Sequence, residues 1–133
     1  MLTTLFAPPP RTADLQPEHA CLIAALRRWV MAQRHEGRCP LQAAAAQLGC
    51  MQAARALHLL LAQVGAAWPD PVAIAPPCCA VLTHDEATIL SLIVASRDHG
   101  RPVFDALLCE MLNEDARDRL FGAAERLGEV IGC

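Results

Sequence analysis

The chain contains no lysine and no tyrosine, and it has no apolar run of the roughly 18 residues that a membrane span needs. All 11 basic residues are arginine, and the formal net charge is -3. Proteins that bind nucleic acid usually carry a positive excess that displaces counterions from phosphate, so we do not expect a nucleic-acid partner. The first ten residues lack the basic region and the cleavage site of a signal peptide. We therefore expect a cytoplasmic protein without a membrane span.

Signatures of known catalytic sites are also missing. The sequence contains no Gly-x-Ser-x-Gly, no His-Glu-x-x-His and no glycine-rich phosphate loop. Serines and five histidines are present, but isolated histidines on helices are more often structural residues than catalytic bases. The sequence does not decide whether the protein is an enzyme, and we favour a non-catalytic role.

The composition is that of a globular domain with apolar surface to bury. Apolar residues make up 54% of the chain and charged residues 19%, which argues against disorder. A chain of 133 residues fits one domain. We expect a flexible N-terminal arm over residues 1–15, which contains three consecutive prolines, and a single domain over residues 16–133. The apolar excess also predicts a homo-oligomer or another protein partner.

Apolar residues recur at helical spacing in six segments, and proline, glycine and capping residues mark the ends of these segments. The chain is therefore predicted to be all-α, a small domain of five to six helices in which helical hairpins are joined by an extended connection over residues 66–81. The predicted helices run from Pro17 to near Gly37, from Pro40 to Gly49, from Met51 to Val64 with Gly65 as the stop, from Thr83 to Gly100, from Pro102 past Met111, and from Asn113 to Ile131.

The same spacing predicts which side of each helix is buried. Arg27 falls outside the apolar stripe of the first helix, and Leu59 is expected to widen the buried stripe of the third. Thr83 and Glu86, three residues apart, predict a capping box at the start of the fourth helix. The predicted buried stripe of the third helix consists of Leu57, Leu60, Leu61 and Val64. The apolar residues of the fifth helix are Val103, Phe104, Leu107, Leu108 and Met111. The sixth helix has a charged outer face formed by Asp115, Asp118, Arg119, Glu125, Arg126 and Glu129.

Seven cysteines form an odd set at irregular spacing, so we expect reduced thiols and no disulfide framework. Cys78 and Cys79 lie shortly before the predicted helix start at Thr83, where amide donors and the helix dipole can favour a thiolate. The functional hypothesis for this segment is either a redox-active thiol or a zinc or iron site formed by Cys78, Cys79 and His84. The chain lacks the paired Cys-x-x-Cys motifs of a zinc signature, however, so we favour buried or incidental thiols, and we give little weight to a vicinal disulfide.

Two further patterns are open to more than one interpretation. The segments from Pro40 and Met51 have the lengths of a helix-turn-helix, but the second segment would turn apolar residues such as Leu57 toward DNA, so we favour an ordinary helical hairpin. Arginines concentrate in the first half of the chain and carboxylates in the last third. Such charge runs are usually solvated faces, although this asymmetry can also orient head-to-tail contacts between subunits.

The run Ile74-Ala75-Pro76-Pro77-Cys78-Cys79, followed by Leu82-Thr83-x-Asp85-Glu86, resembles the central signature of a family of short, uncharacterised bacterial proteins. The resemblance covers most of residues 16 to 131 and implies an all-helical bacterial domain in which the two cysteines belong to a shared motif. It implies no substrate. From the residues and the resemblance together we expect a protein-interaction or regulatory module that self-associates. The alternative is a thiol-based metal-binding or redox-responsive protein that uses Cys78 and Cys79.

Overall fold

The computed structural model describes residues 10–131. In this part of the chain the backbone forms six α-helices, two short helical turns of other types, and no strand, so the prediction of a small all-α domain is confirmed. The elements, in order, are η1 (Thr12–Asp14), α2 (Pro17–Gln33), α3 (Pro40–Leu48), α4 (Met51–Ala67), α5 (His84–Val94), η2 (Ala95–His99), α6 (Arg101–Leu108) and α7 (Glu114–Val130).

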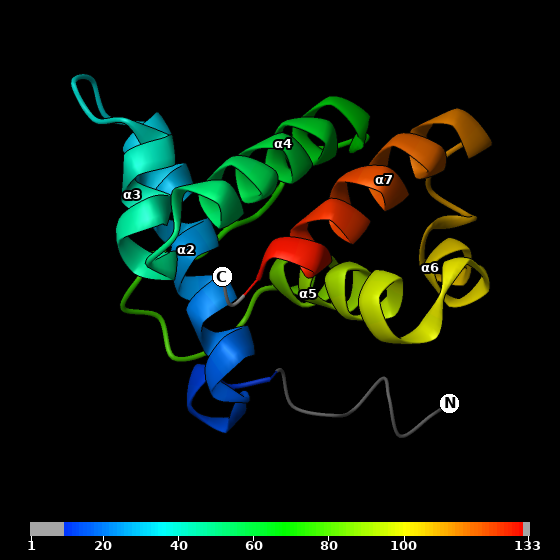
Figure 1. Ribbon diagram of the computed structural model, residues 1–133, viewed down its shortest axis with the longest axis horizontal. Coiled ribbons are helices and arrows are strands. Elements are labelled where there is room, and N and C mark those ends of the chain that lie inside the picture. Colours follow the sequence, from blue (N-terminus) through cyan, green and yellow to red (C-terminus); the bar gives the residue numbers. More distant parts are fainter. Residues whose placement is uncertain (1–9, 132–133) are drawn as a thin grey trace.

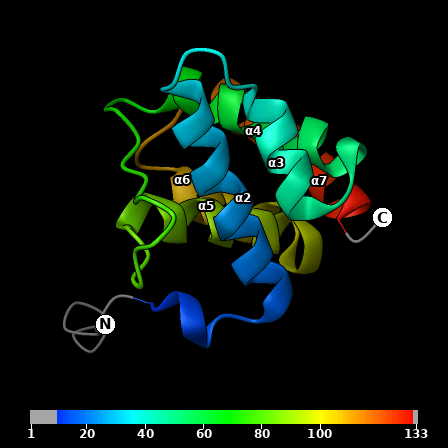
Figure 2. The ribbon, with the colours of Figure 1, turned by 90° about the vertical axis from the view of Figure 1, so that its left-hand side faces the viewer.

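The helices form two groups that meet along α4 and α7. Helix α3 packs against both α2 and α4, and α5, η2 and α6 pack around α7. Helices α4 and α7 lie side by side across the middle of the molecule (Figure 1). The connection between α4 and α5, residues 68–83, runs along one side of the molecule beside α2 (Figure 2). This path carries the connection across the first group of helices.

Local signals in the sequence set most of the helix ends. Pro17 and Pro40 occupy first-turn positions, where a missing amide costs nothing. Gly49 follows α3 with a φ of 74°, in the left-handed region that favours glycine. Asn113 caps α7 by accepting a hydrogen bond from the amide of Ala116. These predicted starts and stops are confirmed.

The ends of several helices differ from the predictions. Helix α2 ends at Gln33 rather than near Gly37, and α6 ends at Leu108 rather than including Met111. The predicted stop at Gly65 is wrong, since α4 continues through it to Ala67. Glycine weakens a helix by only about 1 kcal/mol relative to alanine. The buried Val64 before Gly65 and the partly buried Ala67 after it both pack against the core, which offsets that cost. Beyond α5 the backbone widens into the π-turn η2, closed by a 2.8 Å hydrogen bond from the amide of Gly100 to the carbonyl of Ala95.

The buried face of α4 agrees with the helical spacing, apart from one residue. The predicted stripe of α4, from Leu57 to Val64, is buried, and Leu57 and Leu60 have no exposed surface. Leu59 was expected to widen this stripe and instead is 52% exposed. With 3.6 residues per turn, Leu59 is about 200° from Leu57 around the helix, so it lies on the opposite side.

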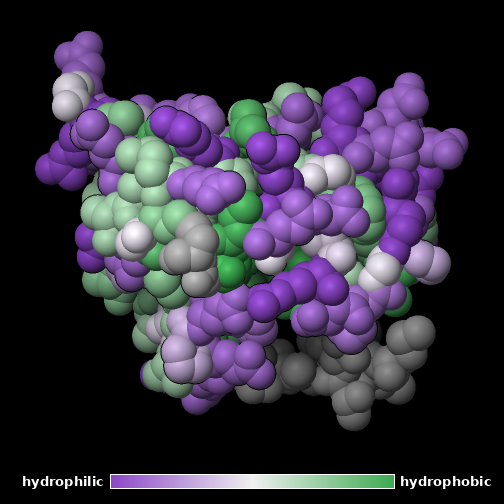
Figure 3. All heavy atoms as spheres, viewed as in Figure 1, coloured by the Kyte–Doolittle hydropathy of each residue, from purple (hydrophilic) through white to green (hydrophobic). Residues whose placement is uncertain are grey.

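The outer face of α7 is charged as predicted. Its six predicted charged residues are all exposed. In the space-filling view, hydrophilic residues cover the region of α7, whereas the alanine-rich α3 is apolar (Figure 3). The opposite side of α7 packs through Leu120, Ala124 and Leu127, which have no exposed surface. Helix α7 therefore separates the core from solvent.

The described part of the predicted N-terminal arm, residues 10–15, contacts the connection. Leu82 donates a hydrogen bond from its amide to the carbonyl of Pro10, and Thr12 donates to the carbonyl of Ala80. Arg11 and Val81 form an isolated antiparallel bridge. Residues 1–9 of the predicted arm lie outside the described residues. Of the helices in residues 10–131, none combines the length and the apolar character of a membrane span.

Two neighbouring leucines test the orientation of α4. Truncation of the fully buried Leu60 to alanine should lower the free energy of unfolding by about 2 to 5 kcal/mol, because it leaves a cavity. Truncation of the exposed Leu59 to alanine should change it by no more than about 0.5 kcal/mol. Urea unfolding followed by circular dichroism measures both. Equal losses in the two variants would contradict this packing.

Candidate functional site

A buried ion pair joins α2 to the start of α5. Arg27 is 2% exposed and Glu86 has no exposed surface. The Arg27 Nε donates to Glu86 Oε2 at 2.8 Å, and its Nη2 donates to Oε1 at 3.0 Å. This two-bond geometry is the strongest form of an arginine–carboxylate contact. The pair therefore fixes α2 and α5 relative to each other.

The same two side chains bind the backbone of the connection. Arg27 also donates to the carbonyls of Cys79, at 2.7 Å, and Val81, at 3.0 Å. Glu86 accepts from the amides of Thr83, at 2.8 Å, and Ala75, at 3.1 Å. Backbone groups in a buried segment need such partners, because an unpaired one is costly. The ion pair thus supplies the hydrogen bonds that a strand would otherwise obtain from a sheet.

The expectation that Arg27 falls outside the buried stripe of the first helix is wrong, since Arg27 is buried. Arginine is rarely buried, but its burial is tolerated when its donors are paired. The capping box of Thr83 and Glu86 is confirmed in both of its hydrogen bonds. The sequence therefore revealed one role of Glu86, the local one, and not its partner 59 residues away.

Electrostatics keep Arg27 charged. The hydrogen bond to Glu86 raises the pKa of Arg27 above its usual value, and the negative charge of Glu86 adds to the rise. Burial acts in the opposite direction and is outweighed. Arg27 is therefore protonated at any pH at which the protein can be handled.

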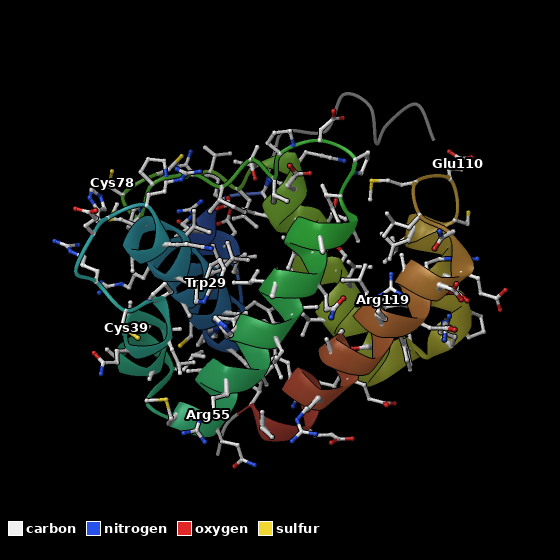
Figure 4. The ribbon with its side chains drawn as sticks, turned by 90° about the horizontal axis from the view of Figure 1, so that it is seen from above. Trp29, Cys39, Arg55, Cys78, Glu110 and Arg119 are labelled. Atoms are coloured by element: carbon white, nitrogen blue, oxygen red, sulfur yellow. The ribbon has the colours of Figure 1, made fainter. Side chains whose placement is uncertain are left out.

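Cys78 and Cys79 lie in a tight turn of the connection. The amide of Cys79 donates to the carbonyl of Pro76 at 3.0 Å, with Pro77 in the position of a turn that proline favours. Cys78 is exposed at the edge of the molecule (Figure 4), and Cys79 is half-buried. The Cys79 thiol donates to the carbonyl of Val81 at 3.3 Å, and both thiols are free. Neither thiol forms a hydrogen bond with an amide of the α5 first turn.

His84, the third residue of the predicted metal site, faces a different part of the molecule. It is exposed and lines a hollow of about 410 Å³ together with Cys109 and Met111, which lie at the end of α6. Within residues 10–131, no three His, Cys, Asp or Glu side chains come together in a way that could hold a metal ion. A zinc or iron site at Cys78, Cys79 and His84 remains a prediction from the sequence.

One cysteine departs from the expectation of reduced thiols. Cys50 is disulfide-bonded, and its sulfur also accepts a hydrogen bond from the amide of Ala53 at the start of α4. The described cysteines that are free are Cys21, Cys39, Cys78, Cys79 and Cys109. The expectation is therefore wrong for Cys50.

Helix α6 has a row of exposed apolar residues. The apolar pattern of the sequence did not distinguish these residues from the buried ones. Val103 and Leu107 are each 44% exposed, and Met111, just beyond the helix, is 38% exposed. Phe104 and Leu108, which share the predicted apolar set, have no exposed surface. All five residues fit one apolar set in the sequence. Because the short helix packs against the core on one side only, the neighbouring row of apolar residues is exposed to solvent. We call Val103, Leu107 and Met111 the α6 row.

Comparisons with protein-family models, with curated proteins and with solved structures find no match for this chain. The resemblance to short bacterial proteins with a paired-cysteine motif remains a prediction. The function is therefore argued from the geometry of the molecule alone.

Removal of one partner from the buried pair should be costly. Arg27→Met leaves the carboxylate of Glu86 buried and unpaired, so we expect the free energy of unfolding to fall by about 3 to 5 kcal/mol. The double variant Arg27→Met with Glu86→Leu should lose less than the sum of the two single variants, because no charge remains buried. Urea unfolding measures the cycle. Additive losses would contradict the contact.

The exposures of the thiols predict their order of labelling. Cys78 should react with a small thiol reagent faster than Cys79, whose thiol is half-buried and bonded to Val81. Mass spectrometry of the folded protein after brief labelling reports each site. Cys39 and Cys109, which are also exposed, are matched controls. A rate at Cys78 far above both controls would support the reactive-thiol hypothesis, whereas equal rates would oppose it.

Metal analysis tests the predicted ion site. Protein purified without a chelator would contain stoichiometric zinc or iron if Cys78, Cys79 and His84 bind it, and the double variant Cys78→Ser with Cys79→Ser would lose it. Protein that folds and contains no metal would end this hypothesis.

Proposed function

We propose that the chain is a non-catalytic protein-interaction module that self-associates through the α6 row. The observation that carries this proposal is the exposure of three large apolar side chains at intervals of four residues. Val103 and Leu107, four residues apart on α6, form one ridge along the helix surface, with Met111 just beyond the end of the helix. Two such ridges pack against each other in the commonest class of helix contact. The occupant of this surface is a second copy of the chain.

The surroundings of the row suit a contact between identical copies. Leu90 and Val94 of α5 line a shallow hollow beside Val103 and Leu107, which extends the apolar area. His99 lies at one end of α6 and Glu110 at the other. In an antiparallel pair of α6 helices, the end that carries His99 in one copy lies beside the end that carries Glu110 in the other. A two-fold interface of this kind is self-complementary.

We also propose that the protein is cytoplasmic. We further propose a regulatory role, in which self-association controls which partners the module binds. Within residues 10–131, the five free cysteines support a reducing compartment, and the disulfide at Cys50 counts against it. The predicted bacterial origin depends on the resemblance of the Cys78–Cys79 segment.

A charged residue in the row should separate the copies. Leu107→Glu buries a carboxylate in the interface, so we expect self-association to weaken at least about thirtyfold, as for other central apolar contacts. Leu59→Glu is the matched control, since Leu59 is similarly exposed, on α4. Sedimentation equilibrium measures association, and circular dichroism verifies the fold. A monomeric native protein, or equal effects of the two variants, would refute the proposal.

Salt distinguishes this interface from the head-to-tail alternative. Association through the apolar ridge should change little between low and high salt, because burial of apolar surface is not screened and an exposed contact of His99 with Glu110 contributes at most about 1 kcal/mol. Contacts between the arginine-rich half of one copy and the acidic third of another should weaken as salt rises. Sedimentation across a range of ionic strengths separates the two, and dissociation in high salt would favour the charged contact.

A further inference from the structure

A groove of about 660 Å³ lies between α2, α4 and the connection. This volume is within the range, roughly 300 to 1,000 Å³, of pockets that hold small ligands. Its walls are largely apolar and include Trp29, Leu61, Trp68 and Ile74. The groove is separate from the α6 row, although Trp68 borders both the groove and the hollow beside α6.

One wall of the groove contains a histidine whose tautomer is fixed. The indole Nε1 of Trp29 donates to Nδ1 of His58 at 3.0 Å, and the two rings meet edge to face. An indole nitrogen can only donate, so His58 Nδ1 must carry the lone pair and Nε2 the proton. Trp29 extends from α2 into the space beside α4 (Figure 4). His58 therefore presents an N–H donor in an apolar setting.

The groove also contains one charge of each sign. Arg34 follows the end of α2, and Asp70 lies in the connection just after α4. Both side chains are exposed, and within residues 10–131 neither forms an ion pair. Elsewhere in that range, arginines such as Arg27, Arg97 and Arg101 are paired with carboxylates. Arg34 and Asp70 thus remain available to a ligand.

The α4 wall is low because its residues are small. Ala62 and Gly65 both line the groove and are exposed. A Cβ atom added at Gly65 would meet nothing within 4 Å, so this glycine borders open space. Glycine inside a helix costs stability, and here it leaves room where a side chain would reduce the groove.

We propose that this groove binds a small zwitterion with an apolar or aromatic body, in the form of a short apolar peptide with free termini. The apolar walls accommodate the side chains, Arg34 binds the terminal carboxylate and Asp70 binds the terminal ammonium. His58 Nε2–H donates to a carbonyl of the peptide. A ligand with only one charge would leave either Arg34 or Asp70 without an oppositely charged group to bind.

Intrinsic fluorescence gives a direct measurement of binding. The chain contains two tryptophans and no tyrosine, and both tryptophans line the groove. The probe is the dipeptide Leu-Phe, which does not absorb where tryptophan is excited. We expect a saturable change in the emission of the native protein as Leu-Phe is added at millimolar concentrations.

Chemical blocking of the two termini tests the charges. N-acetyl-Leu-Phe lacks the ammonium, and Leu-Phe amide lacks the carboxylate, so each should bind about tenfold more weakly than the free dipeptide, the loss expected for one charge-assisted hydrogen bond. The variants Arg34→Ala and Asp70→Asn should weaken the free dipeptide by a similar factor. Arg28→Ala is the matched control, because Arg28 is an exposed arginine of the same helix that lines a different hollow.

A further variant tests the location of the site. Gly65→Leu places a side chain in the open space of the groove, so binding should be lost while the fold, monitored by circular dichroism, is kept. All titrations are repeated in the Leu107→Glu background, so that a change in self-association at Trp68 cannot be mistaken for binding. The proposal is overturned if Leu-Phe causes no saturable change, if blocked and free dipeptides bind equally, or if Arg34→Ala behaves like Arg28→Ala.

Discussion

The buried contact between Arg27 and Glu86 is the constraint on which the rest of this structure depends. The connection between α4 and α5 has no strand neighbour over most of its length, so its backbone groups need other partners. Arg27 pairs with two of its carbonyls and Glu86 with two of its amides. The two side chains neutralise each other at the same time. This one contact thus pairs the buried charge of Arg27 on α2 with that of Glu86 on α5, and it holds the connection against both helices.

The position of the connection determines what the surface offers. Because its backbone is held at Ala75 and Thr83, the preceding residues form the third wall of the groove, and the turn at Cys78 projects into solvent. Asp85 supplements this anchoring by accepting from the amide of Ala73 at 2.7 Å and from the indole of Trp68. The α6 row lies on the other group of helices and does not depend on this contact. Ligand binding and self-association are therefore expected to be separable.

The sequence was sufficient wherever a feature has a local cause. Prolines, glycines and caps act within one helical turn, so the helix starts at Pro17 and Pro40 and the capping box at Thr83 could be predicted. Burial of Arg27 could not, because it depends on a carboxylate 59 residues away. The exposure of Leu107 was missed for a related reason. Helical spacing shows which residues are apolar, whereas the packing of neighbouring helices decides which of them are covered.

Hydrogen exchange of individual backbone amides tests the central claim most directly. The amides of Ala75 and Thr83 belong to no regular element, yet both donate to Glu86. We predict that they exchange slowly in the native protein, at rates near those of the α5 core, and that the Glu86→Ala variant makes both exchange fast under conditions where α7 remains protected. Fast exchange of both amides in the native protein would contradict the claim that the ion pair holds the connection in place.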